Sequence, residues 1–307
     1  MEKFSFLGAD GLTTIACYYY PSQIPTKGLI YFAHGVSEYA LRHSEFFRTL
    51  TKAGYSVLAN DHMGHGNSIA TQPGYFNSRG GARGWDCACR DAYRCIYEGQ
   101  SQFQIPKSLP VYGIGFSLGS FIVRTLAIRS PLLFRGMVLI GTGYQNLINT
   151  TLGKHVAESE TEIHGHSSFT DKVTELTFGE YNKTFEGKTK ADWLCANEAA
   201  RQRYLADEKC TEGFTAGLFA DLLFGMEYTC DRGNMKQMEK DMPIYMVSGA
   251  DDPVGNFGDG IKKLYKKLHR LGFNVGYSLF ANMRHDVLHE RNAHYVLVDI
   301  IRFLDRI

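Results

Sequence analysis

The chain has 307 residues, of which 44% are hydrophobic and 21% are charged. This length and composition allow a sizeable core, and they exclude a disordered chain or a mini-protein held together by disulfides. The 33 lysines and arginines nearly balance the 32 aspartates and glutamates, so the overall charge gives no reason to expect a nucleic-acid partner.

The cysteines and the first residues bear on the cellular compartment. The seven cysteines show no C-x-x-C spacing, which argues against a disulfide framework or a zinc knuckle. Residues 1–10 become polar too soon for a signal-peptide core, and no later stretch stays apolar for the ~18 residues of a membrane span. We therefore expect a cytoplasmic protein with no membrane span.

Strand and helix patterns alternate along the first part of the chain. Runs of β-branched, aromatic and aliphatic residues predict strands at 13–20, 28–33, 55–59, 109–114 and 136–140. Apolar residues at helical spacing predict helices at 44–53, at 85–99 and from about 117 to just before Pro131. This alternation predicts an α/β fold with a mostly parallel central sheet and helices on both faces.

The alternation stops near residue 143 and returns after residue 231. Helical, polar and aromatic stretches occupy the interval, at 192–205 and 214–228, and we interpret it as an inserted helical cap. Beyond the interval the pattern predicts strands at 244–248 and 275–280 and helices at 260–271 and 289–304. The predicted organisation is a core in two parts, 1–142 and 232–307, separated by a cap at 143–231.

A possible nucleophile lies between a predicted strand and a predicted helix, in Gly115-Phe116-Ser117-Leu118-Gly119. The pattern G-x-S-x-G is typical of a nucleophile elbow, a tight strand-to-helix turn that projects the serine. The alternative is a glycine-rich turn without chemistry. A dinucleotide site is not favoured, because Leu118 stands where G-x-G-x-x-G needs its third glycine.

A serine nucleophile needs a base, and the base needs a group that orients it. Asp251 and Asp252 follow the predicted strand at 244–248, at the end of the sheet where α/β proteins gather functional groups. Asp252 is our candidate for the orienting carboxylate, and Asp251 is its competitor, with a turn role as the alternative.

The candidate base is His285, which follows the predicted strand at 275–280. His289 and His294 are alternatives within the predicted last helix. The chain order Ser117, Asp252, His285 is the order described for hydrolases of this architecture.

Acyl chemistry also needs donors for the oxygen that becomes negative. Such donors are usually the N–H after the nucleophile and an N–H from an earlier strand-to-helix loop. The backbone N–H groups of Leu118 and Val36 occupy these two places in the sequence.

The remaining histidines do not favour a metal site. His62 and His65 form one short group and His164 and His166 another, but neither has the third ligand or the H-E-x-x-H helix of a catalytic zinc site. We expect no metal and no organic cofactor.

The cap carries an apolar stretch at helical spacing, in which Phe214, Leu218 and Leu222 are our candidates for substrate contact. Packing against the core is the first expectation for such a stretch. A cap must also cover the active site, and an apolar roof would favour an acyl chain over a charged peptide.

A basic stretch stands in the predicted helix at 260–271. It could touch an anionic surface, but the neutral total charge favours a solvated helix face. Its members are Lys262, Lys263, Lys266, Lys267 and Arg270.

Taken together, several motifs resemble the monoacylglycerol lipase and lysophospholipase branch of the α/β-hydrolases. They stand at 34–38, 61–68, 115–119, 252–255 and 284–285, and the cap is similar to bacterial relatives at 191–195 and 206–210. The chain departs from the lipases at Ser37 and Tyr39, where a small residue and a histidine are frequent, and this bears on the acyl-group preference.

This resemblance implies an α/β-hydrolase fold with a helical cap. It also implies Ser117 as nucleophile, Asp252 and His285 as its partners, and Val36 and Leu118 as oxyanion donors. The implied substrate is a small-molecule ester or lipid, most directly a monoacylglycerol or a lysophospholipid, with transient membrane-surface contact through the cap. Alternatives are a short-chain carboxylesterase, an aminopeptidase-like amide hydrolase that uses acidic cap residues, and a hydrolase-fold ligand-binding protein.

Overall fold

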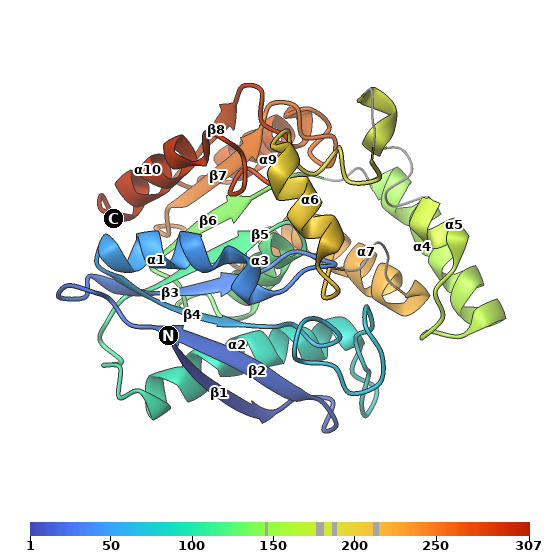
Figure 1. Cartoon of the computed structure of the whole chain (residues 1–307), viewed down its shortest axis with the longest axis horizontal. Coiled ribbons are helices and arrows are strands. Elements are labelled where there is room, and N and C mark those ends of the chain that lie inside the picture. Colours follow the sequence, from blue (N-terminus) through green and yellow to red (C-terminus); the bar gives the residue numbers. More distant parts are fainter. Residues whose placement is uncertain (145–146, 176–180, 186–188, 211–214) are drawn as a thin grey trace.

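An eight-stranded sheet forms the centre of the protein in a computed structural model, which describes residues 1–144, 147–175, 181–185, 189–210 and 215–307 (Figure 1). The strand order is β1-β2-β4-β3-β5-β6-β7-β8, and β2 runs antiparallel to β1 and β4 while the other neighbouring pairs are parallel. The strands are β1 Glu2–Leu7, β2 Thr14–Tyr20, β3 Gly28–Ala33, β4 Tyr55–Asn60, β5 Val111–Phe116, β6 Gly136–Ile140, β7 Ile244–Gly249 and β8 Val275–Phe280.

Helices cover both faces of this sheet. Side chains alternate along a strand, so Ile30 and Phe32 of β3 join the core on one face while Leu29 and Tyr31 join the core on the other. The helices α1 (Ser44–Lys52) and α10 (Ala293–Leu304) pack on the first face, and α2 (Gly84–Gln102), α3 (Leu118–Arg129) and α9 (Asp259–Arg270) pack on the second. The predicted α/β architecture is confirmed.

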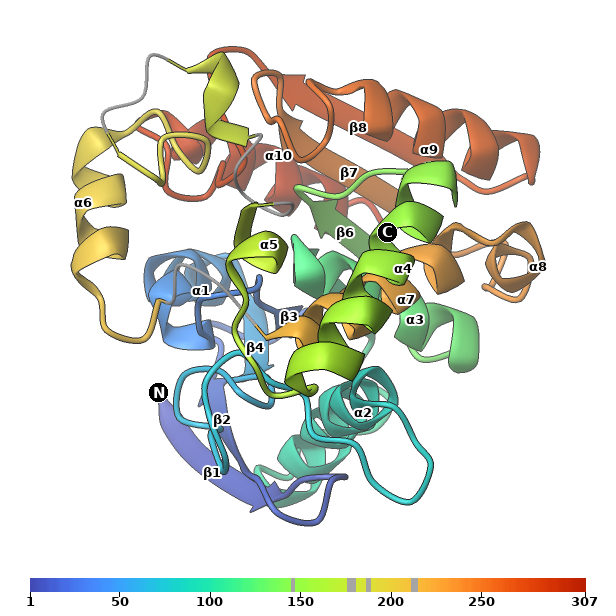
Figure 2. The same cartoon turned by 90° about the vertical axis from the view of Figure 1, so that its right-hand side faces the viewer.

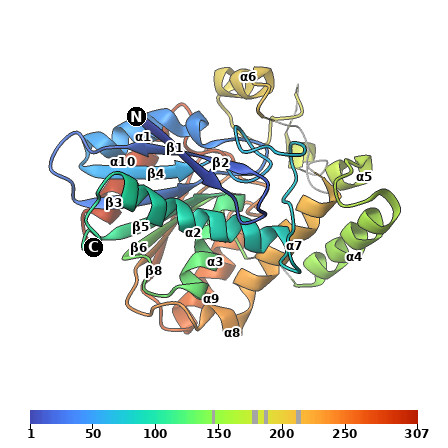
Figure 3. The same cartoon turned by 90° about the horizontal axis from the view of Figure 1, so that it is seen from below.

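The apolar spacing explains how each helix lies. In α9 the buried residues Ile261, Leu264 and Leu268 repeat every three or four positions, so the helix buries one stripe and leaves its lysines exposed. In α3 every residue from Leu118 to Ile128 is buried, because the helix is packed between the sheet and the helix α7 (Ala216–Cys230) (Figure 3).

The described parts of the segment between β6 and β7 form helices joined by turns. The helix α7 packs against α2 and α3, and it approaches so closely that a Cβ atom at Gly225 would lie 2.3 Å from the Trp85 ring. The helix α4 packs on α7, while α6 stands apart from it (Figure 2). The cap bounds 143–231 stay a prediction. The helices of this segment are α4 Leu147–His164, α5 Asp171–Thr174, η3 Tyr181–Thr184, α6 Glu198–Ala206, α7 Ala216–Cys230 and, just beyond, α8 Arg232–Met235.

Two predicted helices begin later than expected. The helix predicted from 192 begins at Glu198, because the turns of Ala191–Cys195 bury Trp193 and Cys195 in a small core of their own. The helix predicted from 289 begins at Ala293. In the described ranges, the helices fall short of the combined length and apolar character that a bilayer crossing requires.

Candidate active site

The turn from β5 to α3 holds Ser117 in a strained backbone conformation, with φ 52° and ψ −118°. A Cβ atom at Gly115 would lie 2.3 Å from the carbonyl oxygen of Gly119, and one at Gly119 would lie 2.0 Å from the carbonyl oxygen of Ala33. Both approaches are too close for any side chain, so both positions require glycine. Ser117 itself stays partly exposed between buried neighbours.

The structure brings Asp252 and His285 together. Nδ1 of His285 lies 3.0 Å from both carboxylate oxygens of Asp252, which is completely buried. The Ser248 hydroxyl donates to Oδ2 of Asp252 and the Val254 N–H donates to Oδ1, both at 2.9 Å. These two hydrogen bonds hold the carboxylate in place, and the carboxylate in turn orients the imidazole through Nδ1. Nε2 is then the nitrogen that can accept a proton.

The pKa values of the two groups move apart because each stabilises the charge of the other. Burial alone would raise the pKa of the Asp252 carboxyl, but His285 and the hydrogen bond from Ser248 hold it below the usual value. Burial alone would lower the pKa of His285, but Asp252 raises it above the usual value. The pair is thus suited to hold an imidazolium next to a carboxylate.

The His285 ring lies close to the turn that carries Ser117. It packs against Phe116, the residue before Ser117, with ring centroids 5.1 Å apart, and against Trp193 at 5.4 Å. A Cβ atom at Gly141 would lie 2.8 Å from Cε1 of the imidazole. The Ser117 hydroxyl makes no hydrogen bond to His285 within the described ranges.

The competing residues lie elsewhere. Asp251 is half-buried, and its N–H donates to the carbonyl of Met283 at 3.0 Å. Nδ1 of His289 lies 2.9 Å from Asp286, and His294 is exposed on α10 with its ring beside Tyr295. Of the two aspartates and three histidines weighed from the sequence, only Asp252 and His285 form a pair.

The N–H groups of Val36 and Leu118 have no hydrogen-bond acceptor in the part of the chain that the structure describes. The loop that contains Val36 is held by its own contacts, since the Gly35 N–H donates to Glu38 at 2.6 Å and Ser37 adopts a positive φ of 57°. The start of α3 is near this loop, because a Cβ atom at Gly119 would lie 2.6 Å from the carbonyl oxygen of His34. Two free amides therefore stand on adjoining segments.

A buried ionic network, which the sequence did not predict, joins the loop that contains Val36 to the loop that carries His285. Arg42 donates to Glu38 at 2.7 Å and to Asp286 at 2.6 Å, and Glu38 also contacts His43 at 2.9 Å. Burial would raise the pKa of the Glu38 carboxyl, but His43 and Arg42 lower it to about 2. Asp286, the second partner of Arg42, directly follows His285. The network therefore links the loop of the Val36 amide to the loop of the candidate base.

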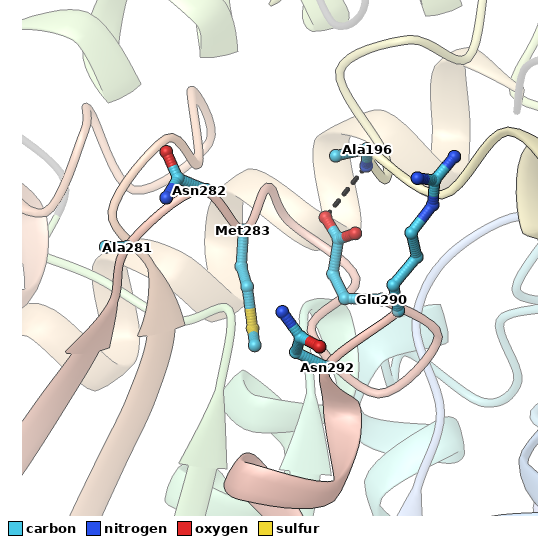
Figure 4. A pocket seen from close by; sticks show the side chains of 7 residues that line it. Ala196, Ala281, Asn282, Met283, Glu290 and Asn292 are labelled. Atoms are coloured by element: carbon cyan, nitrogen blue, oxygen red, sulfur yellow. Dashed lines mark hydrogen bonds between the residues drawn. The ribbon is translucent and has the colours of Figure 1, made fainter.

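Glu290 is a second buried residue that sequence reasoning missed. Its Oε1 accepts the N–H of Ala196 at 2.8 Å and the N–H of Arg284 at 2.9 Å, at one wall of a small pocket of about 230 Å³ (Figure 4). Its Oε2 accepts the N–H of Asn197 at 3.2 Å. One carboxylate thus joins the start of α6 to the residue directly before His285.

The cap residues proposed for substrate contact have different surroundings. Leu218 is completely buried in the core that includes α2 and α3, and Leu222 packs partly buried against the same core. Phe214 lies outside the described residues. For the two residues that are described, the packing expected from their helical spacing is confirmed.

The histidines at 62 and 65 are buried with His34 rather than exposed on a loop. The rings of His34 and His62 are 4.1 Å apart, and Nε2 of His62 and Nε2 of His65 are buried without a partner in the described chain. Burial lowers the pKa of both side chains, so they are uncharged near neutral pH. No set of three histidine, cysteine or acidic side chains suited to a metal ion occurs within the described residues.

Comparison with solved structures supports the fold. A thermostable carboxyl esterase from Bacillus coagulans superposes with a TM-score of 0.90 at 23% identity, covering 100% of this chain and 98% of that one. A soluble variant of monoglyceride lipase from Saccharomyces cerevisiae superposes with a TM-score of 0.77 at 16% identity, covering 100% and 94%. At these identities the likeness establishes the α/β-hydrolase fold alone.

Comparison of sequences identifies the family. The chain is 32% identical to the monoglyceride lipase of Homo sapiens over 134 residues, and 30% identical to the monoacylglycerol lipase of Mycolicibacterium smegmatis over 144 residues. These alignments cover 44% and 46% of this chain but only 41% and 46% of the relatives. The sequence model of the family described as Serine aminopeptidase, S33, in contrast, matches residues 24–292. The chain therefore belongs to the serine aminopeptidase S33 family of α/β-hydrolases.

Proposed function

We propose that the protein hydrolyses carboxylic esters through an acyl-enzyme on Ser117, with a monoacylglycerol or a lysophospholipid as substrate. The observation that carries this proposal is the Asp252–His285 pair, which lies against Phe116 beside the strained Ser117 turn. An ester is the substrate class named for the human and mycobacterial relatives.

In the proposed reaction, Nε2 of His285 takes the proton of the Ser117 hydroxyl as its oxygen attacks the ester carbonyl. Asp252 stabilises the imidazolium that forms, in keeping with the raised pKa of His285. The imidazolium then protonates the departing alcohol. Water attacks the acyl-enzyme by the same route and releases the acid.

The carbonyl oxygen becomes negative in each tetrahedral intermediate, and we assign the N–H groups of Val36 and Leu118 as its donors. Both amides lack another acceptor among the described residues, so they are free to bind this oxygen. Donors fixed before the reaction stabilise the developing charge without reorganising.

The substrate preference is part of the proposal. An acyl chain needs an apolar lining, and Phe214 and Leu222 of the cap remain our candidates for it, whereas Leu218 has no exposed surface with which to contact a substrate. With such a substrate we also propose transient contact between the cap and a lipid surface, and a cytoplasmic location. Cell fractionation and flotation with vesicles would check these two points.

The family description raises an amide substrate as the second candidate. An aminopeptidase needs a free carboxylate for the substrate ammonium, and the exposed carboxylates of Glu162 and Glu198 are available for this role. Two other carboxylates are less suited to it, because Glu160 pairs with Lys172 at 3.4 Å and Asp221 accepts a hydrogen bond from the backbone N–H of Trp85. Both side chains are thus engaged within the protein.

Labelling with a fluorophosphonate probe tests the nucleophile. We expect one adduct in the intact mass of the wild type and none in Ser117→Ala, with Ser120→Ala as the matched control on the same helix. Labelling that survives in Ser117→Ala would overturn the assignment.

Turnover then tests the substrate class. We expect kcat/KM for a long-chain monoacylglycerol or lysophospholipid to exceed that for short aryl esters and aminoacyl amides. Faster turnover of the amides would favour an aminopeptidase. Ligand binding with neither labelling nor turnover would favour a non-catalytic binding protein.

A further inference from the structure

A cavity with three cationic side chains lies between α8 and the last part of α9. Figures 2 and 3 show where these two helices lie in the fold. Its volume is about 210 Å³, several times the ~30 Å³ that one water molecule occupies in the liquid but below the ~300 Å³ of a typical pocket for a whole ligand. It therefore suits a single small group. The lining residues are Cys230, Arg232, Met235, Lys267, Arg270 and Leu271.

The charges around this cavity are unbalanced. No carboxylate lines it, and Arg232, Lys267 and Arg270 have no acidic partner within the described ranges. The ammonium of Lys267 lies over the Tyr144 ring, 4.2 Å from its centroid, which leaves its charge without a counter-ion. Like charges that share one site repel each other, and a bound anion would relieve that repulsion.

The position of the cations on α9 has a simpler explanation that covers only part of the cluster. Lys267 and Arg270 lie in the last turn of α9, where the partial negative charge of a helix C-terminus favours cations. Arg232 belongs to a separate helix, α8, and borders the same cavity. The helix dipole therefore does not account for the convergence of all three.

The floor of the cavity is built from the core. Cys230 and Met235 are 5% and 1% exposed, whereas the three cations are exposed at the rim. A group that entered would meet apolar contacts below and charged donors around its edge. Two guanidinium groups and one ammonium offer donors to several oxygens at once, which matches a phosphate group better than a single carboxylate.

We propose that this cavity binds a phosphate group, through Arg232, Lys267 and Arg270. The group could belong to a soluble phosphate compound or to a phospholipid headgroup, and both present the same oxygens. The site is separate from the Ser117 region, and the proposal does not depend on the proposed ester hydrolysis.

The test compares two double variants of the full chain that lose the same charge. Arg232→Gln/Arg270→Gln removes two cations of the cavity. Lys262→Gln/Arg302→Gln removes two exposed cations elsewhere, which pair with Asp259 and Asp299. The melting temperature and the far-UV circular dichroism spectrum check that both variants fold.

Two binding measurements separate the sources of phosphate. One is titration calorimetry with inorganic phosphate, at an ionic strength matched with sodium chloride. The other is co-sedimentation with vesicles of phosphatidylcholine alone or mixed with phosphatidic acid. We expect the cavity variant to bind about tenfold or more weakly than wild type in at least one of these assays, and the control variant to bind nearly as wild type.

Loss of binding to inorganic phosphate in the cavity variant alone would support a soluble ligand. Loss confined to the mixed vesicles would support a headgroup. Wild type that binds neither probe, or an equal loss in both double variants, would overturn the proposal and leave these cations as a solvated surface.

Discussion

Replacing Arg42 with methionine tests how the buried network supports the site. Arg42 is 9% exposed, and its partners Glu38 and Asp286 are 3% and 0% exposed. Removing the cation leaves two buried carboxylates without it, and breaking a buried pair in this way costs about 3 to 5 kcal/mol. We expect Arg42→Met to lower the free energy of unfolding by that amount near neutral pH.

The pKa of Glu38 gives the direction in which this loss depends on pH. It falls from 4.5 to about 2, because His43 and Arg42 outweigh the effect of burial. At ~1.4 kcal/mol for each pKa unit, the whole shift corresponds to about 3 kcal/mol, of which Arg42 supplies only a part, because His43 makes the larger contribution. A carboxyl whose pKa is lowered on folding stabilises the protein above its unfolded pKa, and this stabilisation is lost as the pH falls toward the folded value. The difference between wild type and Arg42→Met should therefore shrink as the pH falls below about 4.5.

Urea unfolding followed by tryptophan fluorescence, at pH about 7, 5 and 4, measures this difference. Arg48→Met is the matched control, because Arg48 is 53% exposed and its ion pair with Glu45 is a surface pair worth ~0.5 kcal/mol or less. Equal losses in the two variants would refute the reasoning, as would a loss in Arg42→Met that does not change with pH.

Other variants test the site itself. Asp252→Asn should lower kcat/KM for an ester by about 10³-fold or more, since the imidazole loses its orienting carboxylate; activity within tenfold of wild type would contradict this role. Asp252 raises the pKa of His285 above 6.5, and the base must be neutral to accept a proton. Wild-type activity should therefore fall as the pH drops through a midpoint above 6.5, and activity that does not change with pH in this range would count against His285. Gly119→Ala should abolish soluble, active protein because its Cβ meets backbone, whereas Gly276→Ala, with 3.9 Å to the nearest atom, should express normally. Glu290→Gln should lower both the ester turnover and the melting temperature. Unchanged values would mean that the three amide contacts of Glu290 do not support the loop that carries His285.

Much of the fold could be predicted because each core strand is marked locally. β3 is a continuous apolar run and β4 is interrupted only by Ser56, and such runs are typical of strands buried on both faces. β1 was missed because only Phe4 is buried in its six residues, so it has no such run. The helix α10 begins at Ala293 because the residues after His285 form turns that hold Asp286 and Glu290 in buried contacts.

In the candidate site, too, some residues are marked by a local sequence pattern and others are not. Ser117 could be proposed as the nucleophile because G-x-S-x-G marks a turn that is sterically limited, in part locally, since a Cβ atom at Gly115 would meet Gly119 four residues later. The limit at Gly119 comes from Ala33 of β3, which the local pattern does not reveal. The pairing of Arg42 with Asp286 joins positions that are remote in sequence, and no local pattern distinguishes a buried arginine from an exposed one. Such contacts follow from the packing of the whole chain.

The long segment between β6 and β7 affects the order in which the protein can form during synthesis. Ile140 ends β6 and Ile244 begins β7, so residues 141–243 must be made before these two strands can pair. Until then β6, whose five residues are all buried in the finished protein, is an open sheet edge on the nascent chain. Ribosome-bound intermediates should therefore depend on chaperones to shield that edge, and chains released before β7 should aggregate rather than accumulate as partly folded protein.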